Sequence, residues 1–153
     1  MSMSRVFFSI LSGAALLCYA ALLLITIRNG LHQRSHRYFA VYLGGMVVWS
    51  LGALMTYLAP EHARFWNQVM MAGVAVTPLA FYGFVQGFLG RSNRDPYIIP
   101  GAVVLLVSLF LNAGGALVAR ISVSQTGLIV FSFGPAMPLF SAYFPFFQLL
   151  VAY

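Results

Sequence analysis

Four segments of this chain contain no charged residue, and each is long enough to cross a lipid bilayer. They cover residues 6–27, 38–59, 69–90 and 97–119. A helix of about 22 residues is about 33 Å long, which matches the roughly 30 Å hydrocarbon core of a bilayer. A fifth apolar segment, residues 139–153, would reach only about 22 Å as a helix. We therefore expect an all-α, polytopic transmembrane helical bundle with about five spans.

The composition excludes a water-soluble domain. Hydrophobic residues make up 61% of the chain and charged residues 7%, whereas about 25% of the residues in an average soluble domain are charged. The arginines that give the net charge of +6 lie singly or in small groups between apolar segments. Nucleic-acid binding would need them gathered on one water-facing surface. We expect the lipid bilayer as a partner and no nucleic acid.

The arginines also indicate the orientation in the membrane. Arg28, Arg34 and Arg37 lie in the loop after the first segment, and Arg91 and Arg94 lie in the loop after the third. The loops of the other side hold three arginines: Arg5, Arg64 and Arg120. Because basic loops stay in the cytoplasm, we expect a multi-pass protein of the inner (cytoplasmic) membrane with its N-terminus outside.

The linker between the fourth and fifth segments differs from the other loops. Residues 121–124 alternate apolar and polar side chains, residues 125–127 contain a glycine, and residues 128–133 are mostly β-branched or aromatic. This pattern predicts a small β-hairpin, which would lie on the outer side. Gly134 and Pro135 would end it before the fifth helix.

No residue pattern in this chain indicates a catalytic, cofactor or metal site. His32 and His36 have the spacing of two metal ligands on one helix, but a stable site needs three or four ligands. His62 would lie on the opposite side of the membrane. The sequence contains no phosphate-binding loop, nucleophile elbow or zinc-protease motif. We therefore expect no enzyme activity in this chain.

The uncharged polar and small residues within the apolar segments are candidate packing or signalling positions. Asn112 lies four residues after Ser108, and Gln148 lies midway along the fifth segment. Such groups usually bond to a neighbouring helix, and a ligand or signalling role is the alternative. Gly83 and Gly87 form a small-xxx-small pair that indicates close helix packing. Pro78, in the middle of the third segment, predicts a kink.

An ordered series of aromatic, proline and glycine residues lies along the second and third segments and the loops that flank them. It consists of Trp49, Gly52, Pro60, Glu61, Phe65, Trp66, Gly73, Pro78, Phe81, Phe84 and Arg91. With the arginine-rich first loop and Gly134-Pro135, this series resembles the N-terminal seven-transmembrane sensor region of bacterial histidine kinases. The resemblance covers nearly the whole chain, from about Val6 to Tyr153.

This resemblance implies a membrane input region that passes a signal to a cytoplasmic output domain. The output would be the kinase of a two-component system, and similar regions are also attached to diguanylate cyclases. The chain departs from the family because it stops near the fifth of seven spans, so we expect it to be truncated at the C-terminus. We further expect homodimerisation through the missing downstream region and an unknown, hydrophobic ligand.

Two other classes of function stay open at this point. The chain could be a small transporter or channel subunit that works as an oligomer, or a structural membrane protein without a ligand. Ion-coupled transporters use ionisable groups within the membrane, and none lies inside an apolar segment here. That absence counts against ion-coupled transport.

Overall fold

The fold of the chain is an all-helical bundle with one small hairpin, as the sequence predicted. It is described by a computed structural model that covers residues 3–90, 96–123 and 129–152. The helices are α1 (Met3–Arg28), α2 (Arg34–Leu58), a 3-10 turn η1 (Pro60–His62), α3 (Ala63–Phe88), α4 (Ile98–Ala113) and α5 (Met137–Ala152). The strands are β1 (Val118–Val123) and β2 (Ile129–Phe133).

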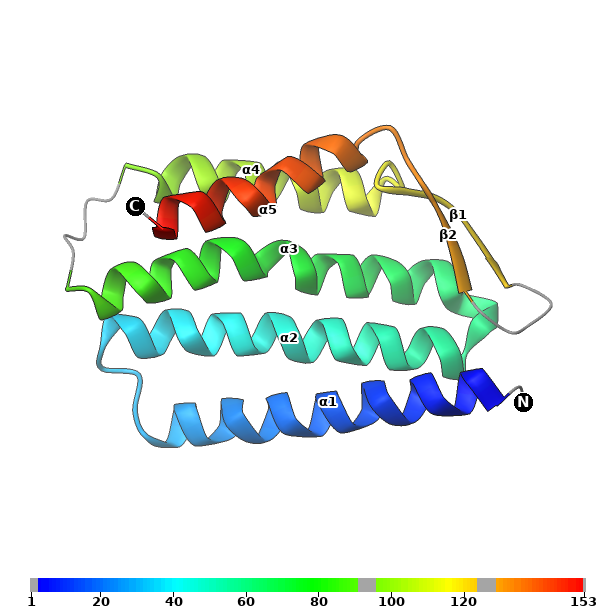
Figure 1. The fold of residues 1–153 in the computed structure, drawn as a ribbon, viewed down its shortest axis with the longest axis horizontal. Helices are drawn as coiled ribbons and strands as arrows, with labels where there is room; N and C mark the ends of the chain where they lie inside the picture. Colours follow the sequence, from blue (N-terminus) through cyan, green and yellow to red (C-terminus); the bar gives the residue numbers. More distant parts are fainter. Residues whose placement is uncertain (1–2, 91–95, 124–128, 153) are drawn as a thin grey trace.

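The helices lie side by side, with α3 in the middle of the bundle. Figure 1 shows α1, α2 and α3 following one another in a row, while α4 and α5 cover the other side of α3. The start of α1, the α2–α3 connection and the two strands are at one end, which we call the hairpin end. The α1–α2 connection lies at the opposite end. Arg5, Arg64 and Arg120 are therefore at the hairpin end, away from Arg28, Arg34 and Arg37.

Within the described residues, three helices are long and apolar enough to cross a membrane. These stretches are Arg5–Arg28, Arg34–Leu58 and Pro60–Phe88. The helices α4 and α5 are also apolar but have 16 residues each, or about 24 Å. The helix α1 packs on α2, and none of its most apolar window is buried inside the bundle. Its outer surface is therefore suited to contact lipid.

The helix α4 is shorter than the apolar segment 97–119 predicted, and that prediction of its end was wrong. The helix ends at Ala113, and Gly115 adopts a left-handed conformation with φ +76°. The Gly115 N–H then donates to the Asn112 carbonyl and the Ala116 N–H to the Leu111 carbonyl, which is a Schellman ending. Leu117 and Val118 continue the apolar sequence as buried residues at the base of the hairpin.

The predicted hairpin is confirmed and begins earlier than expected. Strand β1 pairs with β2 in antiparallel register from Val118 opposite Phe133 to Val123 opposite Ile129. Below the strands, the Gly134 N–H donates to the Leu117 carbonyl at 2.8 Å. The predicted turn at residues 125–127 lies outside the described residues.

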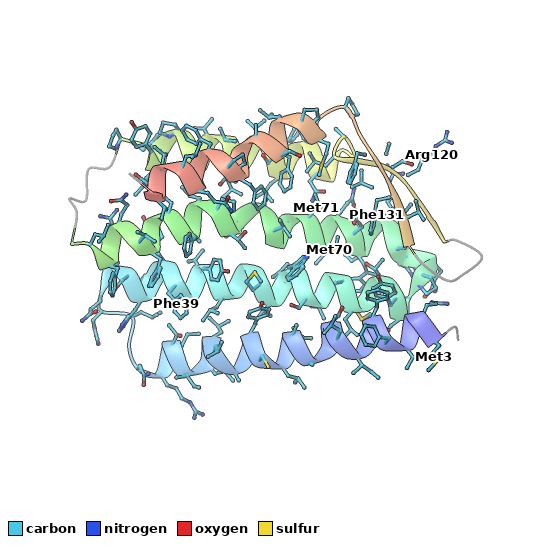
Figure 2. The ribbon with its side chains drawn as sticks, in the orientation of Figure 1. Met3, Phe39, Met70, Met71, Arg120 and Phe131 are labelled. Atoms are coloured by element: carbon cyan, nitrogen blue, oxygen red, sulfur yellow. The ribbon has the colours of Figure 1, made fainter. Side chains whose placement is uncertain are left out.

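Among the described residues, two buried apolar clusters lie on the side of α3 that faces α5. The first joins Met71, Ala75, Leu117, Val118 and Phe140, so it connects α3, the hairpin base and α5. Figure 2 labels Met70 and Phe131, which pack against this cluster. The second consists of Tyr82, Tyr143 and Phe147. The helix α5 is thus held along most of α3.

Candidate functional site

The helices α2 and α3 approach each other through glycines. A methyl group added to Gly73 would lie 2.5 Å from the backbone nitrogen of Trp49, and one added to Gly52 would lie 2.6 Å from that of Met70. No side chain therefore separates the two backbones at these positions. The Trp49 side chain points elsewhere, since it lines a hollow against Leu11 and Ala15 of α1.

The predicted small-xxx-small pair also packs within the chain. Gly83 lies against the ring of Tyr38, and a methyl group on Gly87 would be 3.0 Å from the backbone nitrogen of Ser35. Both contacts are made with the first turns of α2. The structure thus places Gly83 and Gly87 at an internal helix contact.

Asn112 joins α4 to α3 near the hairpin end. Its side-chain nitrogen donates to the Gln68 carbonyl at 2.7 Å. In return, Gln68 Nε2 donates to the carbonyl of Asn112 at 3.1 Å and to that of Ala113 at 3.2 Å. These bonds satisfy carbonyls at the end of α4 that have no partner within the helix.

The remaining predicted positions at the hairpin end lie in or next to the α2–α3 and β2–α5 connections. Pro60 opens the 3-10 turn before α3. Trp66 is half-buried, with its ring edge-on to that of Phe65 at 5.1 Å. Gly134 is buried against the Ala116 carbonyl, while Pro135 is exposed. None of these residues lines the cavity described next.

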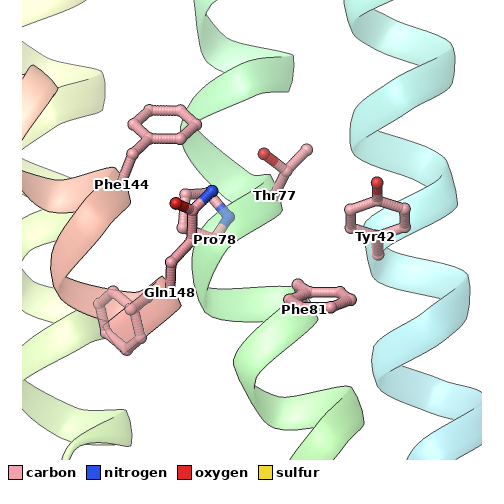
Figure 3. Close-up of a pocket in the computed structure, with 7 residues that line it drawn as sticks. Tyr42, Thr77, Pro78, Phe81, Phe144 and Gln148 are labelled. Carbon is pink, nitrogen blue, oxygen red and sulfur yellow. The ribbon is translucent and has the colours of Figure 1, made fainter. Parts of the chain in front are cut away.

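A cavity of about 310 Å³ lies between α2, α3 and α5 (Figure 3). Pro78 and Gln148, both singled out from the sequence, lie together in its wall. The complete lining is Tyr42, Thr77, Pro78, Phe81, Phe144, Phe147 and Gln148. Sequence reasoning missed Tyr42, Thr77, Phe144 and Phe147 as members of a site. Their spacing carried no signal, because the cavity depends on how three helices are placed.

Pro78 has a specific consequence for the cavity wall. A proline has no N–H, so it removes the hydrogen bond to the carbonyl four residues earlier, which here belongs to Val74. The hydroxyl of Thr77 donates to that same carbonyl at 2.8 Å. A side chain therefore replaces the missing backbone donor, as occurs in membrane helices that contain proline. The hydrogen bond missing from α3 is thus replaced by a side chain that lines the cavity.

Charged groups gather away from this cavity. A wider hollow of about 640 Å³ at the hairpin end is lined by Glu61, Arg64, Arg120 and five other residues. At the opposite end, Arg34 and Arg37 line a hollow beside Tyr38. In the ranges 3–90, 96–123 and 129–152, no three His, Cys, Asp or Glu residues gather as a metal site would require. The central cavity and the hollow beside Trp49 have uncharged linings, and only the central cavity is lined by three helices.

Comparison with protein families identifies the chain. Residues 7–153 match the family described as the N-terminal 7TM region of histidine kinase. The chain belongs to this family. The resemblance noted from the aromatic, proline and glycine series is thereby confirmed. No curated protein and no solved structure matches the chain.

Membership in the N-terminal 7TM region of histidine kinase agrees with the structure. The family is a transmembrane one, and three long apolar helices are present here. The matched residues belong to the membrane region of such kinases, which is non-catalytic. The cavity between α2, α3 and α5, which brings Pro78 and Gln148 together, is the candidate functional site.

Proposed function

We propose that this chain is the membrane-embedded sensory region of a bacterial two-component histidine kinase. The observation that carries the proposal is the family match over residues 7–153. The supporting feature is the position of α3, which contains Pro78 and contacts α2, α4, α5 and β1. A change at its cavity would alter how these elements sit relative to one another.

The mechanism we propose is a shift between two arrangements of the bundle. The glycine contacts hold α2 and α3 together, whereas α5 meets α3 through aromatic side chains such as Tyr143 and Phe147. A ligand shifts such an equilibrium only by its difference in affinity for the two arrangements. A molecule in the cavity would contact the α2–α3 pair on one side and α5 on the other. It would therefore favour one position of α5.

Phosphoryl transfer in the whole encoded protein tests this function. We would measure incorporation of labelled γ-phosphate from ATP in native membrane vesicles and compare Pro78→Ala with Phe110→Ala. Phe110 is 79% exposed on α4 and lies outside the cavity, so it is the matched control. Pro78→Ala should change the basal rate severalfold, while Phe110→Ala should leave it unchanged. If the unchanged protein and both variants incorporate no phosphate, the kinase role is overturned.

The reading frame beyond Tyr153 provides a second test. Two further spans followed by a dimerising helical region and an ATPase region would support the kinase assignment and the proposed homodimer. A cyclase in that position would keep the sensory role and change the output. A stop codon directly after Tyr153 would exclude a kinase encoded in one chain.

We also propose that the hairpin end faces outward and that the membrane is the inner one. The arginines Arg28, Arg34 and Arg37 at the opposite end support this orientation. In a Cys18→Ser background, single cysteines at Ser132 and at Asn29 would be treated with a membrane-impermeant maleimide on intact spheroplasts. Labelling of Ser132→Cys alone supports the orientation. Labelling of Asn29→Cys alone would reverse it.

A further inference from the structure

Four residues of α2 line a hollow of about 260 Å³ at the end of the bundle opposite the hairpin end. They are Arg34, Arg37, Tyr38 and Val41. Their spacing of three, one and three positions places them along one face of a helix. The hollow is therefore a strip along the first two turns of α2, with its charged residues at the start and its apolar residue at the end.

This strip crosses the boundary of the membrane. The helix α2 has 25 residues, so it is about 37 Å long and exceeds the roughly 30 Å hydrocarbon core at both ends when it is centred in the bilayer. Arg34, its first residue, then lies at the level of the lipid headgroups. Tyr38 lies about 6 Å deeper and Val41 about 10 Å deeper. A phospholipid presents its charged headgroup, its glycerol esters and its acyl chains in the same order.

The two arginines are suited to bind phosphate. The guanidinium carbon of Arg34 lies 5.5 Å from the centroid of the Tyr38 ring, a contact that attracts the cation to the ring and holds it beside the hollow. A guanidinium has five N–H donors, more than one contact uses. Arg37 is exposed on the same face. Guanidinium groups bind phosphate oxygens through paired N–H donors.

The charges at this end favour a ligand with a net negative charge. Arg34 begins α2, Arg28 ends α1, and the first turn of α2, which the structure describes in full, contains no acidic residue. The N-terminus of a helix favours anions over cations, so an anion beside Arg34 and Arg37 would stabilise this helix end. A zwitterionic lipid would bring a second cation to the same place.

The size and depth of the hollow favour a lipid over a soluble phosphate. At about 30 Å³ for each water-sized group, 260 Å³ holds about eight such groups, whereas a phosphate has five non-hydrogen atoms. A free phosphate on the arginines would leave the part of the hollow beside Tyr38 and Val41 without contacts. Val41 is 51% exposed, and an acyl chain would cover it.

We propose that this hollow binds the phosphate group of an anionic phospholipid. Arg34 and Arg37 hold the phosphate, while Tyr38 and Val41 contact the glycerol and the first part of an acyl chain. The site requires only that α2 spans a membrane, so it does not rest on the proposed sensory function.

A phosphatidylglycerol with a photoactivatable diazirine near the start of one acyl chain is a suitable probe. The whole encoded protein would be reconstituted in phosphatidylcholine vesicles with increasing fractions of this lipid and illuminated, and the labelled residues would be mapped by mass spectrometry. We expect saturable labelling near Val41. Labelling near the exposed Phe110 of α4 should instead rise in proportion to the lipid fraction, since it reports only passing lipid. Proportional labelling at both positions would overturn the proposal.

Three competitors identify the ligand. Unlabelled phosphatidylglycerol should reduce the labelling near Val41 about fivefold more effectively than phosphatidylethanolamine, whose ammonium cancels its charge. Glycerol 3-phosphate in the buffer has the phosphate without acyl chains and should have no effect. Equal competition by the two lipids would contradict recognition of charge. Competition by glycerol 3-phosphate as strong as that by phosphatidylglycerol would assign the hollow to a soluble phosphate compound instead.

Matched arginine variants separate a site from general attraction to a basic surface. Arg37 is exposed, so Arg37→Gln should fold normally and raise the lipid fraction needed for half-saturation about fivefold. Arg28→Gln removes the same charge at the same end, but Arg28 does not line the hollow, so the half-saturating fraction should stay nearly unchanged. Equal effects of the two variants would show diffuse attraction and overturn the site. No effect of Arg37→Gln would overturn it as well.

Discussion

The side-chain amides of Gln68 and Asn112 each donate a hydrogen bond to the other residue's backbone carbonyl, at 3.1 Å and 2.7 Å. The pair lies where α4 ends and the chain turns toward the hairpin. It fixes the end of the short helix α4 to the first half of α3. The hairpin base, with Leu117 and Val118, is buried directly after it.

Replacing Asn112 with leucine should destabilise the bundle. The change removes one interhelical hydrogen bond, which is worth about 0.6 kcal/mol on average and up to about 1.7 kcal/mol in a membrane protein. Unfolding in mixed micelles, followed through the fluorescence of Trp49 and Trp66, would measure the loss. Phe110→Leu on the exposed side of α4 is the control. If the two variants unfold alike, the Gln68–Asn112 pair contributes no stability.

The Thr77 hydroxyl should matter only because residue 78 is a proline. Thr77→Val leaves the Val74 carbonyl without a donor and should cost about 1 kcal/mol. In a Pro78→Ala background, the alanine N–H supplies that bond and the same change should be nearly neutral. A double-mutant cycle of unfolding free energies measures this coupling. Additive effects would show that Thr77 does not compensate for the proline.

Gly73→Ala should strongly destabilise the α2–α3 contact. Its new methyl group would lie 2.5 Å from the Trp49 backbone nitrogen and 2.6 Å from the Gly45 carbonyl oxygen. Because backbone atoms cannot move aside alone, the helices must separate, at a cost of about 1–3 kcal/mol. Gly44→Ala is a matched control on α2, since nothing lies within 4 Å of its added methyl. Equal unfolding free energies would contradict the close approach of α2 and α3.

Gly115→Ala should weaken the ending of α4. Gly115 has φ +76°, a conformation that costs an ordinary residue about 1–2 kcal/mol. Its neighbour Gly114 has φ −73° and only ordinary contacts for an added methyl group, so Gly114→Ala serves as the control. Thermal unfolding should show a lower midpoint for Gly115→Ala alone. A similar shift in both variants would exclude the left-handed ending as its cause.

The sequence predicted the helical class, the number of helices and the hairpin because each depends on local composition. It did not predict that α4 ends at Ala113, because the apolar composition continues through Leu117 into the strand. The Gly114-Gly115 pair was the available signal for that ending.

Only some of the residues that line the cavity could be singled out from the sequence, for a different reason. Pro78 and Gln148 are conspicuous as a proline and an amide within apolar helices, whereas phenylalanines such as Phe144 are common throughout this chain. Which of them face one another depends on the crossing of α2, α3 and α5. Local patterns along the chain do not reveal that crossing, because it depends on packing between residues far apart in the sequence. The role of Thr77 also required the structure, since its hydroxyl had other acceptors available.

The glycine contacts between α2 and α3 have a mechanical consequence. With backbone against backbone at Gly52 and Gly73, there is no layer of side chains whose rotamers could absorb a displacement. At these positions the two helices can shift relative to each other only by moving their backbones. The contact between α3 and α5 differs, because aromatic side chains such as Tyr143 and Phe147 lie between the two backbones and can change rotamer.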